Sequence, residues 1–388
     1  MEESGHYYTV YYTSLAAGFD EKLAYRHAVL AQMPDEVAWF DAAHIHILYC
    51  KTPASRALSS TQSSASGGGQ SIWERSRNFV SDQIDRVTKP VREGLNDRET
   101  NLGGASQSIP NDWRHSVEYN LHALAPNNAS NLVRSSDFQR KKTTEQLDAE
   151  HPASLKFGML LHRLGDSYSH SRIENSKEMY TVSTRDTRWD CVPVKGLKDD
   201  NLGHGTHLTF PDNPLLRQGI FFLYLFNLYE VMQRKVRQYP NLRRNPATTL
   251  SFEELKARYQ KMFNDTLFSP SSYFKDPSLK EQLMEAIRRD CQSTLGVQME
   301  SYRPERFQTQ TLQQFLDQHR ELNDLNIGEQ KLKSTLESMR PELTHADQMT
   351  EFFQSMTPDQ LKAWQQAEAA KAGINLNNIN MNNLWPGR

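Results

Sequence analysis

The chain has few cysteines and no long apolar run, and both absences narrow the class of protein. Its 388 residues include only three cysteines, Cys50, Cys191 and Cys291. An odd number at such wide spacing excludes a disulfide framework and a cysteine zinc site. No segment approaches the roughly 20 apolar residues that cross a bilayer. The N-terminus also lacks the basic flank and apolar core of a signal peptide. We therefore expect a soluble protein that is made in the cytoplasm.

Strong net charge is missing as well. The formal charge is -2 at pH 7, and the isoelectric point is near 6.7. This balance argues against strong non-specific binding to nucleic acid or to acidic membranes, although local basic patches remain open. The length suits one large domain or two to three smaller ones.

Alternation of apolar and polar residues, the pattern of strands, is scarce, and helical periodicity takes its place. It predicts helices over residues 20–33, 111–124, 154–171 and 214–237, after an aromatic, helical lead-in over residues 7–17. The helix over 214–237 is so apolar that we expect it in the middle of the core. The fold class that follows is all-α, a multi-helix bundle.

Composition divides the chain into three parts. Residues 1–245 form the first helical domain, which contains a serine- and glycine-rich flexible loop at about residues 55–70. Residues 246–373 form a helical C-terminal region, and residues 374–388 an asparagine-rich tail. Within the C-terminal region, Thr357-Pro358-Asp359-Gln360 combines an N-cap, a proline at the first helical position and a capping-box glutamine, so we expect a helix to begin there.

The histidines are concentrated in the first half of the chain. Eleven of the thirteen fall at or before position 207. In LLHRLGDSYSHSR, His162, Asp166 and His170 follow one another at intervals of four residues. On an ideal helix they lie within roughly 80° of one another, with neighbours about 6 Å apart. We therefore expect all three on one face of a leucine-rich, buried helix.

Two interpretations of this face remain open from the segment alone. Two imidazoles and a carboxylate that are buried without partners would cost several kcal/mol, so something must compensate them. They either bond to each other and to the backbone, as a polar network in the core, or they bind a metal ion. Gly165 beside the aspartate indicates the close approach of another chain segment or of an ion.

Further candidates lie up and down the chain. His204 stands between two glycines that let the backbone fold tightly around a ligand. Asp212 follows it, and His122 lies upstream in EYNLHAL. Asp35 follows Pro34 at an apparent helix end, where interaction with a helix terminus competes with a ligand role. Taken singly, each of these residues is more often a solvated side chain or a cap.

HRLGDSYSH resembles the histidine, glycine-aspartate, histidine helix of the zinc-dependent phospholipase C superfamily, which includes the single-strand-specific zinc nucleases. The chain is most similar to poorly characterised bacterial members of that superfamily. The similarity covers roughly residues 5 to 235 and depends on the order of several motifs. These motifs are HYYTVYYTSLAAGF, AYRHAVLAQMPDE, EYNLHAL, LLHRLGDSYSHS and GHGTHLTFPDNP.

The resemblance implies an all-helical bundle with a cluster of two to three zinc ions in a cleft between helices. It implies that Asp166 bridges two ions, and that Asp35 binds metal and orients the attacking water. The residues that it assigns to the metals are Asp35, His122, His162, Asp166, His170 and His204.

The chain departs from the superfamily pattern at two points, the N-terminal ligand and one spacing. The secreted enzymes use a processed N-terminal tryptophan as a ligand, whereas this chain starts at Met1 and offers His6 instead. The spacing from Asp166 to His170 is shorter than in those enzymes. Asp212 is expected where they place a later carboxylate.

The function implied is hydrolysis of phosphodiester bonds, with Asp35 and Asp166 as catalytic residues. By resemblance we expect a phospholipase-C-like enzyme, with a zinc nuclease as the alternative. The partner would then be a phospholipid or a nucleic acid. Two other classes stay open. The first is an antibacterial effector toxin exported without a signal peptide, whose partners would be a secretion apparatus and an immunity protein. The second is a non-catalytic interaction protein that is stabilised by metal.

Overall fold

The computed structural model describes most of the helical part of the chain. The residues it describes are 3–37, 40–41, 113, 116–123, 136–169, 212–215, 217–244, 248–265, 278–309, 311–342 and 357–371. Within these ranges the chain is helical and forms no β-strand, and an isolated bridge joins Phe19 to Arg243. The predicted all-α fold is therefore confirmed. The proposed loop at 55–70 and the tail at 374–388 lie outside the described residues.

The helices follow the predicted pattern closely. In chain order the elements are η1 (Ser4–Thr9), α1 (Val10–Ala17), α2 (Glu21–Glu36), η2 (Ser116–Leu121), α8 (Ser136–Ala149), α9 (Leu155–Ser169), α10 (Gln218–Gln238), η4 (Pro240–Leu242), α11 (Phe252–Asp265), α13 (Ser278–Leu295), α14 (Pro304–Phe307), α15 (Leu312–Gln318), η5 (Arg320–Leu325), α16 (Glu329–Ser338) and α18 (Pro358–Lys371).

Local sequence explains where several helices begin and end. The carboxylate of Asp20 accepts from Leu23 N at 2.9 Å and caps α2. Thr357 and Gln360 exchange the two hydrogen bonds of a capping box at the start of α18, as predicted. The helix α2 runs through Pro34 and is three residues longer than its predicted end, so Asp35 lies in its last turn.

The helices α2 and α9 form the centre of the bundle. Gly158 on α9 faces Leu30 on α2 so closely that a Cβ atom at position 158 would lie 2.3 Å from the Cβ of Leu30. The two helices run in the same direction, because a position later on α9, His162, contacts a position later on α2. Nδ1 of His162 lies near the carbonyl oxygen of Ala31. The C-terminal turns of α2 and α9 therefore meet side by side.

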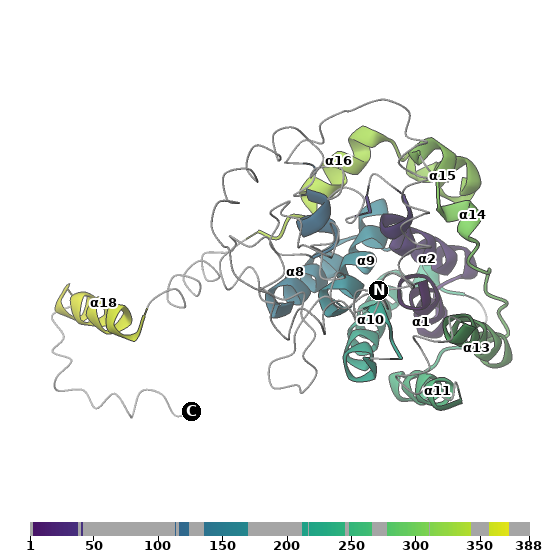
Figure 1. The fold of residues 1–388 in the computed structure, drawn as a ribbon, viewed down its shortest axis with the longest axis horizontal. Coiled ribbons are helices and arrows are strands. Elements are labelled where there is room, and N and C mark those ends of the chain that lie inside the picture. The colour runs from purple at the N-terminus through teal and green to yellow at the C-terminus, as the bar shows by residue number, and fades with distance from the viewer. Residues whose placement is uncertain are drawn as a thin grey trace, which may run out of the picture.

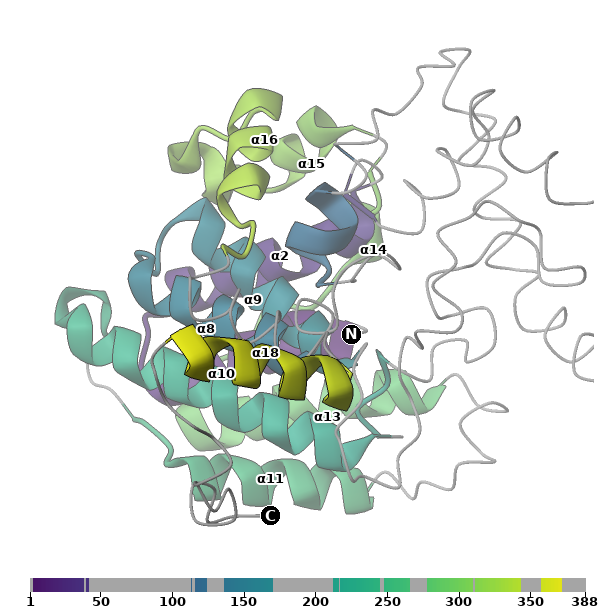
Figure 2. The same ribbon diagram turned by 90° about the vertical axis from the view of Figure 1, so that its left-hand side faces the viewer.

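The remaining helices pack on both sides of this pair. In Figures 1 and 2, α15 and α16 lie on one side of α2 and α9, and α11 and α13 lie on the other. The hydrophobic core is continuous across the predicted boundary at residue 245, because it includes Leu160 and Leu228 as well as Ile287 and Leu336. The C-terminal region thus shares its core with the N-terminal one.

The apolar helix α10 is only partly central. Its inner face is buried, including Tyr224, Leu225 and Leu228, as the sequence predicted. Its outer face meets solvent, since Leu223 and Phe226 are each 48% exposed. Among the helices that the structure describes, none is long and apolar enough to cross a membrane.

Replacing Gly158 with alanine tests the packing of α2 on α9. The added methyl group has no room against Leu30, so one of the two helices must shift. We expect the free energy of unfolding to fall by about 1–3 kcal/mol, measured by urea denaturation of metal-free protein. Gly328→Ala is the matched control, because a Cβ atom there meets nothing within 4 Å. Equal stability of the two variants would contradict this account of the helix pair.

His27 of α2 provides a second test, through its response to acid. Its ring is buried, and the carbonyl oxygen of Pro152 accepts from Nε2 at 2.8 Å. Nδ1 therefore accepts from Ser14 Oγ at 3.1 Å, which requires a neutral ring. Burial lowers the pKa of His27 from 6.5 to about 4. Since the unfolded chain binds this proton more tightly, acid favours unfolding between these two pH values.

We expect His27 to lower the free energy of unfolding by about 3 kcal/mol as the pH falls from about 6.5 to about 4. The estimate uses about 1.4 kcal/mol per pKa unit. His27→Gln should flatten the dependence of unfolding free energy on pH in that window, measured in chelator. The exposed His151 is the control position, and His151→Gln should keep the wild-type slope. A wild-type slope in His27→Gln would show that the ring is not neutral when folded.

Candidate metal centre

Two π-helical segments deliver histidines to one place. His6 lies within η1, and His122 directly follows η2, where its backbone N–H bonds the carbonyl oxygen of Val117 at 3.1 Å. In η1, Thr9 Oγ1 donates to the carbonyl oxygen of Ser4, five residues earlier, at 2.7 Å. Such segments are rare and often mark functional sites. The sequence predicted ordinary helix at both places, because periodicity does not register one extra residue in a turn.

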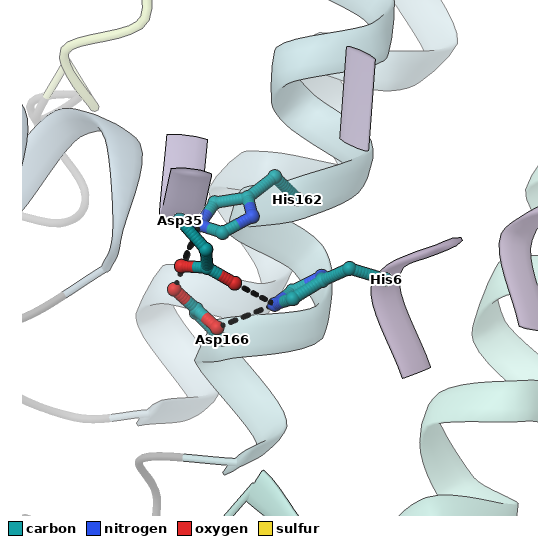
Figure 3. A group of neighbouring side chains, drawn as sticks. All are labelled: His6, Asp35, His162 and Asp166. Atoms are coloured by element: carbon teal, nitrogen blue, oxygen red, sulfur yellow. Dashed lines mark hydrogen bonds and ion pairs between the residues drawn. The ribbon is translucent and has the colours of Figure 1, made fainter. Parts of the chain in front are cut away.

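The helices α2 and α9 supply the other side chains. Asp35 comes from the last turn of α2, while His162 and Asp166 lie one turn apart on α9. Figure 3 shows His6 and His162 directed toward the two carboxylates. One ligand atom from each of His6, Asp35, His162 and Asp166 lies within 4.8 Å of the others, so this group can hold a metal ion.

Asp166 is at the centre of the group. Its Oδ1 lies 2.9 Å from Nε2 of His6. Its Oδ2 lies 2.9 Å from Nδ1 of His122 and 3.0 Å from Nε2 of His162. Asp35 is farther out, with its oxygens 3.7 Å from the nitrogens of His6 and His162 and 3.9 Å from Nδ1 of His122. The two oxygens of Asp166 thus face two different sets of histidines.

Backbone carbonyls fix the ring protons of two histidines. The carbonyl oxygen of Ala31 lies 2.8 Å from Nδ1 of His162, and that of Phe40 lies 2.8 Å from Nε2 of His122. A carbonyl can only accept, so these outer nitrogens carry the hydrogens. The other nitrogen of each ring faces the carboxylate of Asp166, in the orientation that metal-binding histidines have toward their ion.

The inward nitrogens leave an electron-rich centre. Nε2 of His162 and Nδ1 of His122 are 3.0 Å apart, and both lie within 3.0 Å of Oδ2 of Asp166. Three lone-pair atoms at such distances repel one another unless a cation or an added proton lies among them. Burial lowers the pKa of His162 to about 4, which disfavours the added proton at neutral pH. A shared proton or a cation would relieve this repulsion, and the group could hold a metal ion.

The carboxylates differ in charge and exposure. Burial raises the pKa of Asp35 well above its ordinary value, and Asp166, Asp212 and Glu36 add to this effect. Burial also opposes ionisation of Asp166, but neighbouring groups, among them His162 and His6, hold its pKa well below the usual range. The side chain of Asp35 is 31% exposed and that of Asp166 is 2% exposed. Solvent therefore reaches the group at Asp35.

Gly165 explains how η1 reaches α9. A Cβ atom at this position would lie 2.7 Å from Cε1 of His6 and 3.0 Å from its Nδ1. Any larger residue would displace the histidine. The prediction that Gly165 permits the close approach of another segment is confirmed, and that segment carries His6, one of the residues that could hold a metal ion.

The predicted ligands fall into three groups. His6, Asp35, His122, His162 and Asp166 come together, although they lie on four separate elements. Asp212 is buried and near enough to raise the pKa of Asp35, and it is not one of the four residues His6, Asp35, His162 and Asp166 that could share an ion. His170 and His204 lie outside the described residues. Sequence reasoning missed the carbonyl groups of Ala31 and Phe40, since a backbone acceptor has no signature in residue type.

Comparison with protein-family models, with curated proteins and with solved structures finds no match to this chain. The class that the fold and site define is thus an all-α protein with a buried histidine and aspartate group that can hold a metal ion. Similarity to the zinc-dependent phospholipase C superfamily stays a prediction from the order of motifs.

Replacing Asp166 with asparagine tests the group as a metal site. The variant loses the negative charge and one of the two oxygens that face the histidines. We therefore expect metal affinity to fall by more than about 100-fold. Loss of a residue that only hydrogen-bonds to a ligand costs less than this. Metal content by mass spectrometry and competition with a chelator measure this loss, and circular dichroism checks the fold. Asp148→Asn, on the surface beside Arg234, is the control. Equal metal binding by both variants would exclude Asp166 as a ligand.

Proposed function

We propose that the chain is a zinc-dependent phosphodiester hydrolase with phospholipase-C-like activity. The observation that carries the proposal is the buried, electron-rich centre of His122, His162 and Asp166, with the partly exposed Asp35 at its edge. The class of reaction comes from the order of the sequence motifs, which resembles that of the zinc-dependent phospholipase C superfamily.

The donor set suits zinc. Imidazole nitrogens and carboxylate oxygens without thiolates are common zinc ligands, and softer or harder metals prefer other sets. Ligands at about 2.0–2.1 Å from a tetrahedral zinc ion are separated by about 3.3 Å. The separations of 2.9 to 3.0 Å around Asp166 are close to that value. Small outward movements of the side chains would admit an ion.

The number of donors supports more than one ion. A tetrahedral zinc ion takes four ligands, one of which is water at a catalytic site. Five side chains converge here, and the two oxygens of Asp166 face His6 on one side and His122 with His162 on the other. This division supports Asp166 as a bridge in a cluster of two to three ions.

When bound, the zinc ions would supply a hydroxide near neutral pH and positive charge against the phosphoryl oxygens. Asp35 is suited to accept the proton of the attacking water, because its partly exposed side chain gives water access to the carboxylate. The water oxygen would bond to phosphorus while the ester bond to the leaving alkoxide breaks. The proton that Asp35 accepted would then pass to the oxygen of the alkoxide. Asp166 is buried and holds the histidines in place rather than contacting substrate.

Asp35→Asn separates this role from metal binding. The amide keeps an oxygen for the metal but cannot accept the proton, so we expect kcat to fall by about 10²–10⁴-fold while zinc content is retained. The assay uses zinc-loaded protein on phosphatidylcholine vesicles, with single-stranded DNA and RNA in parallel. Asp148→Asn should keep full activity.

The substrates distinguish the alternatives. Cleavage of nucleic acid without cleavage of lipid would make the protein a nuclease. Zinc-loaded protein that cleaves none of the three would make the metal a structural element of an interaction protein. Full turnover after removal of all metal would overturn the hydrolase proposal itself. Export as an antibacterial effector stays a prediction.

A further inference from the structure

The carboxyl end of α16 contacts both segments that carry the inner histidines. Asn120 Nδ2 donates to the carbonyl oxygen of Leu336 at 3.1 Å, in the last turn of α16. Arg163 Nη1 donates to the carbonyl oxygen of Met339, which caps the same helix. Both contacts are buried. The C-terminal region, which the sequence motifs do not cover, thus touches both η2 and α9 through the carboxyl end of α16.

Each of the two donors is a close neighbour of a histidine in the group. Asn120 lies in η2, two residues before His122, and Arg163 directly follows His162 on α9. The two histidine nitrogens that face each other are 3.0 Å apart. Because η2 is a short segment, its position relative to α9 depends on what it packs against, and α16 packs against both.

The chemistry of a helix end makes these contacts strong. The last carbonyl groups of a helix have no partner within it, and they carry partial negative charge. Arg163 is fully buried, and a guanidinium keeps its charge in proteins. A buried cation needs acceptors. It finds them in the carbonyl oxygen of Met339 and in Oε1 of Gln139, at 2.6 Å from Nη2.

We propose that the carboxyl end of α16 is a clamp that holds His122 and His162 at metal-binding distance. Asn120 and Arg163 are then positioning residues, and the C-terminal region is an integral part of the metal centre. The inference rests on the metal centre of the proposed function, and not on its phosphodiesterase activity.

Arg26 offers a matched control. It is also a buried arginine, and its Nη2 donates to a carbonyl oxygen of the C-terminal region, that of Glu321, at 2.9 Å. It lies on α2, nine residues before Asp35, and is not one of the residues that could hold metal. Its loss should weaken attachment of the C-terminal region without moving a histidine.

The experiment compares Asn120→Ala, Arg163→Met, Arg163→Lys and Arg26→Met in the full chain. Zinc affinity is measured by competition with a chromophoric chelator, and stability by urea unfolding of the metal-free protein. We expect Asn120→Ala and Arg163→Met to weaken the tightest zinc site by 10- to 100-fold. Arg163→Lys should recover part of this loss, because it keeps a buried cation toward Met339. Arg26→Met should change zinc affinity less than twofold while it lowers stability.

Two results would overturn the clamp. One is wild-type zinc affinity in both Asn120→Ala and Arg163→Met. The other is a loss of zinc affinity in Arg26→Met that is as large, relative to its loss of stability, as the loss in Asn120→Ala and Arg163→Met. The contacts of Asn120 and Arg163 would then support the fold in general and not the metal centre in particular. If Arg163→Met does not fold, Asn120→Ala and Arg163→Lys decide. Failure of the wild-type chain to bind zinc would instead overturn the proposed function at its base.

Discussion

The close approach of α2 and α9 at Gly158 is the constraint on which the rest of the structure depends. With no side chain at this position, the Leu30 side chain lies directly against the backbone of α9. The two helices then remain in contact for the following turns, which brings Ala31 to His162 and Asp35 to the edge of the group around Asp166. Packing at one glycine thus sets the separation of the acidic and basic side chains of the site.

Backbone carbonyls orient the histidine rings of this candidate metal site. By accepting the outer ring hydrogens of His122 and His162, they force both inner nitrogens to present lone pairs beside a carboxylate. The group lies within a large core, because apolar residues on both sides of residue 245 pack into one cluster.

The fold was largely predictable, and the site was predictable in part. Helical periodicity located α2, α9 and α10, and the four-residue spacing placed His162 and Asp166 on one face of a helix. His6 and Asp166 are separated by 160 positions in the chain, and no local pattern records that they meet. The carbonyl partners have no residue signature, and the contacts of α16 lie beyond the last motif. These features depend on tertiary packing, which periodicity does not encode.

The π-helical turn at η1 has a consequence for how such a site arises in evolution. A π turn is an α turn with one inserted residue, and each residue of an α-helix advances the chain by about 100°. Deleting a single residue between His6 and α1 would restore regular helix and rotate the imidazole away from Asp166. One inserted residue is thus sufficient to direct His6 toward Asp166, and the bond from Thr9 to Ser4 stabilises the turn that contains it.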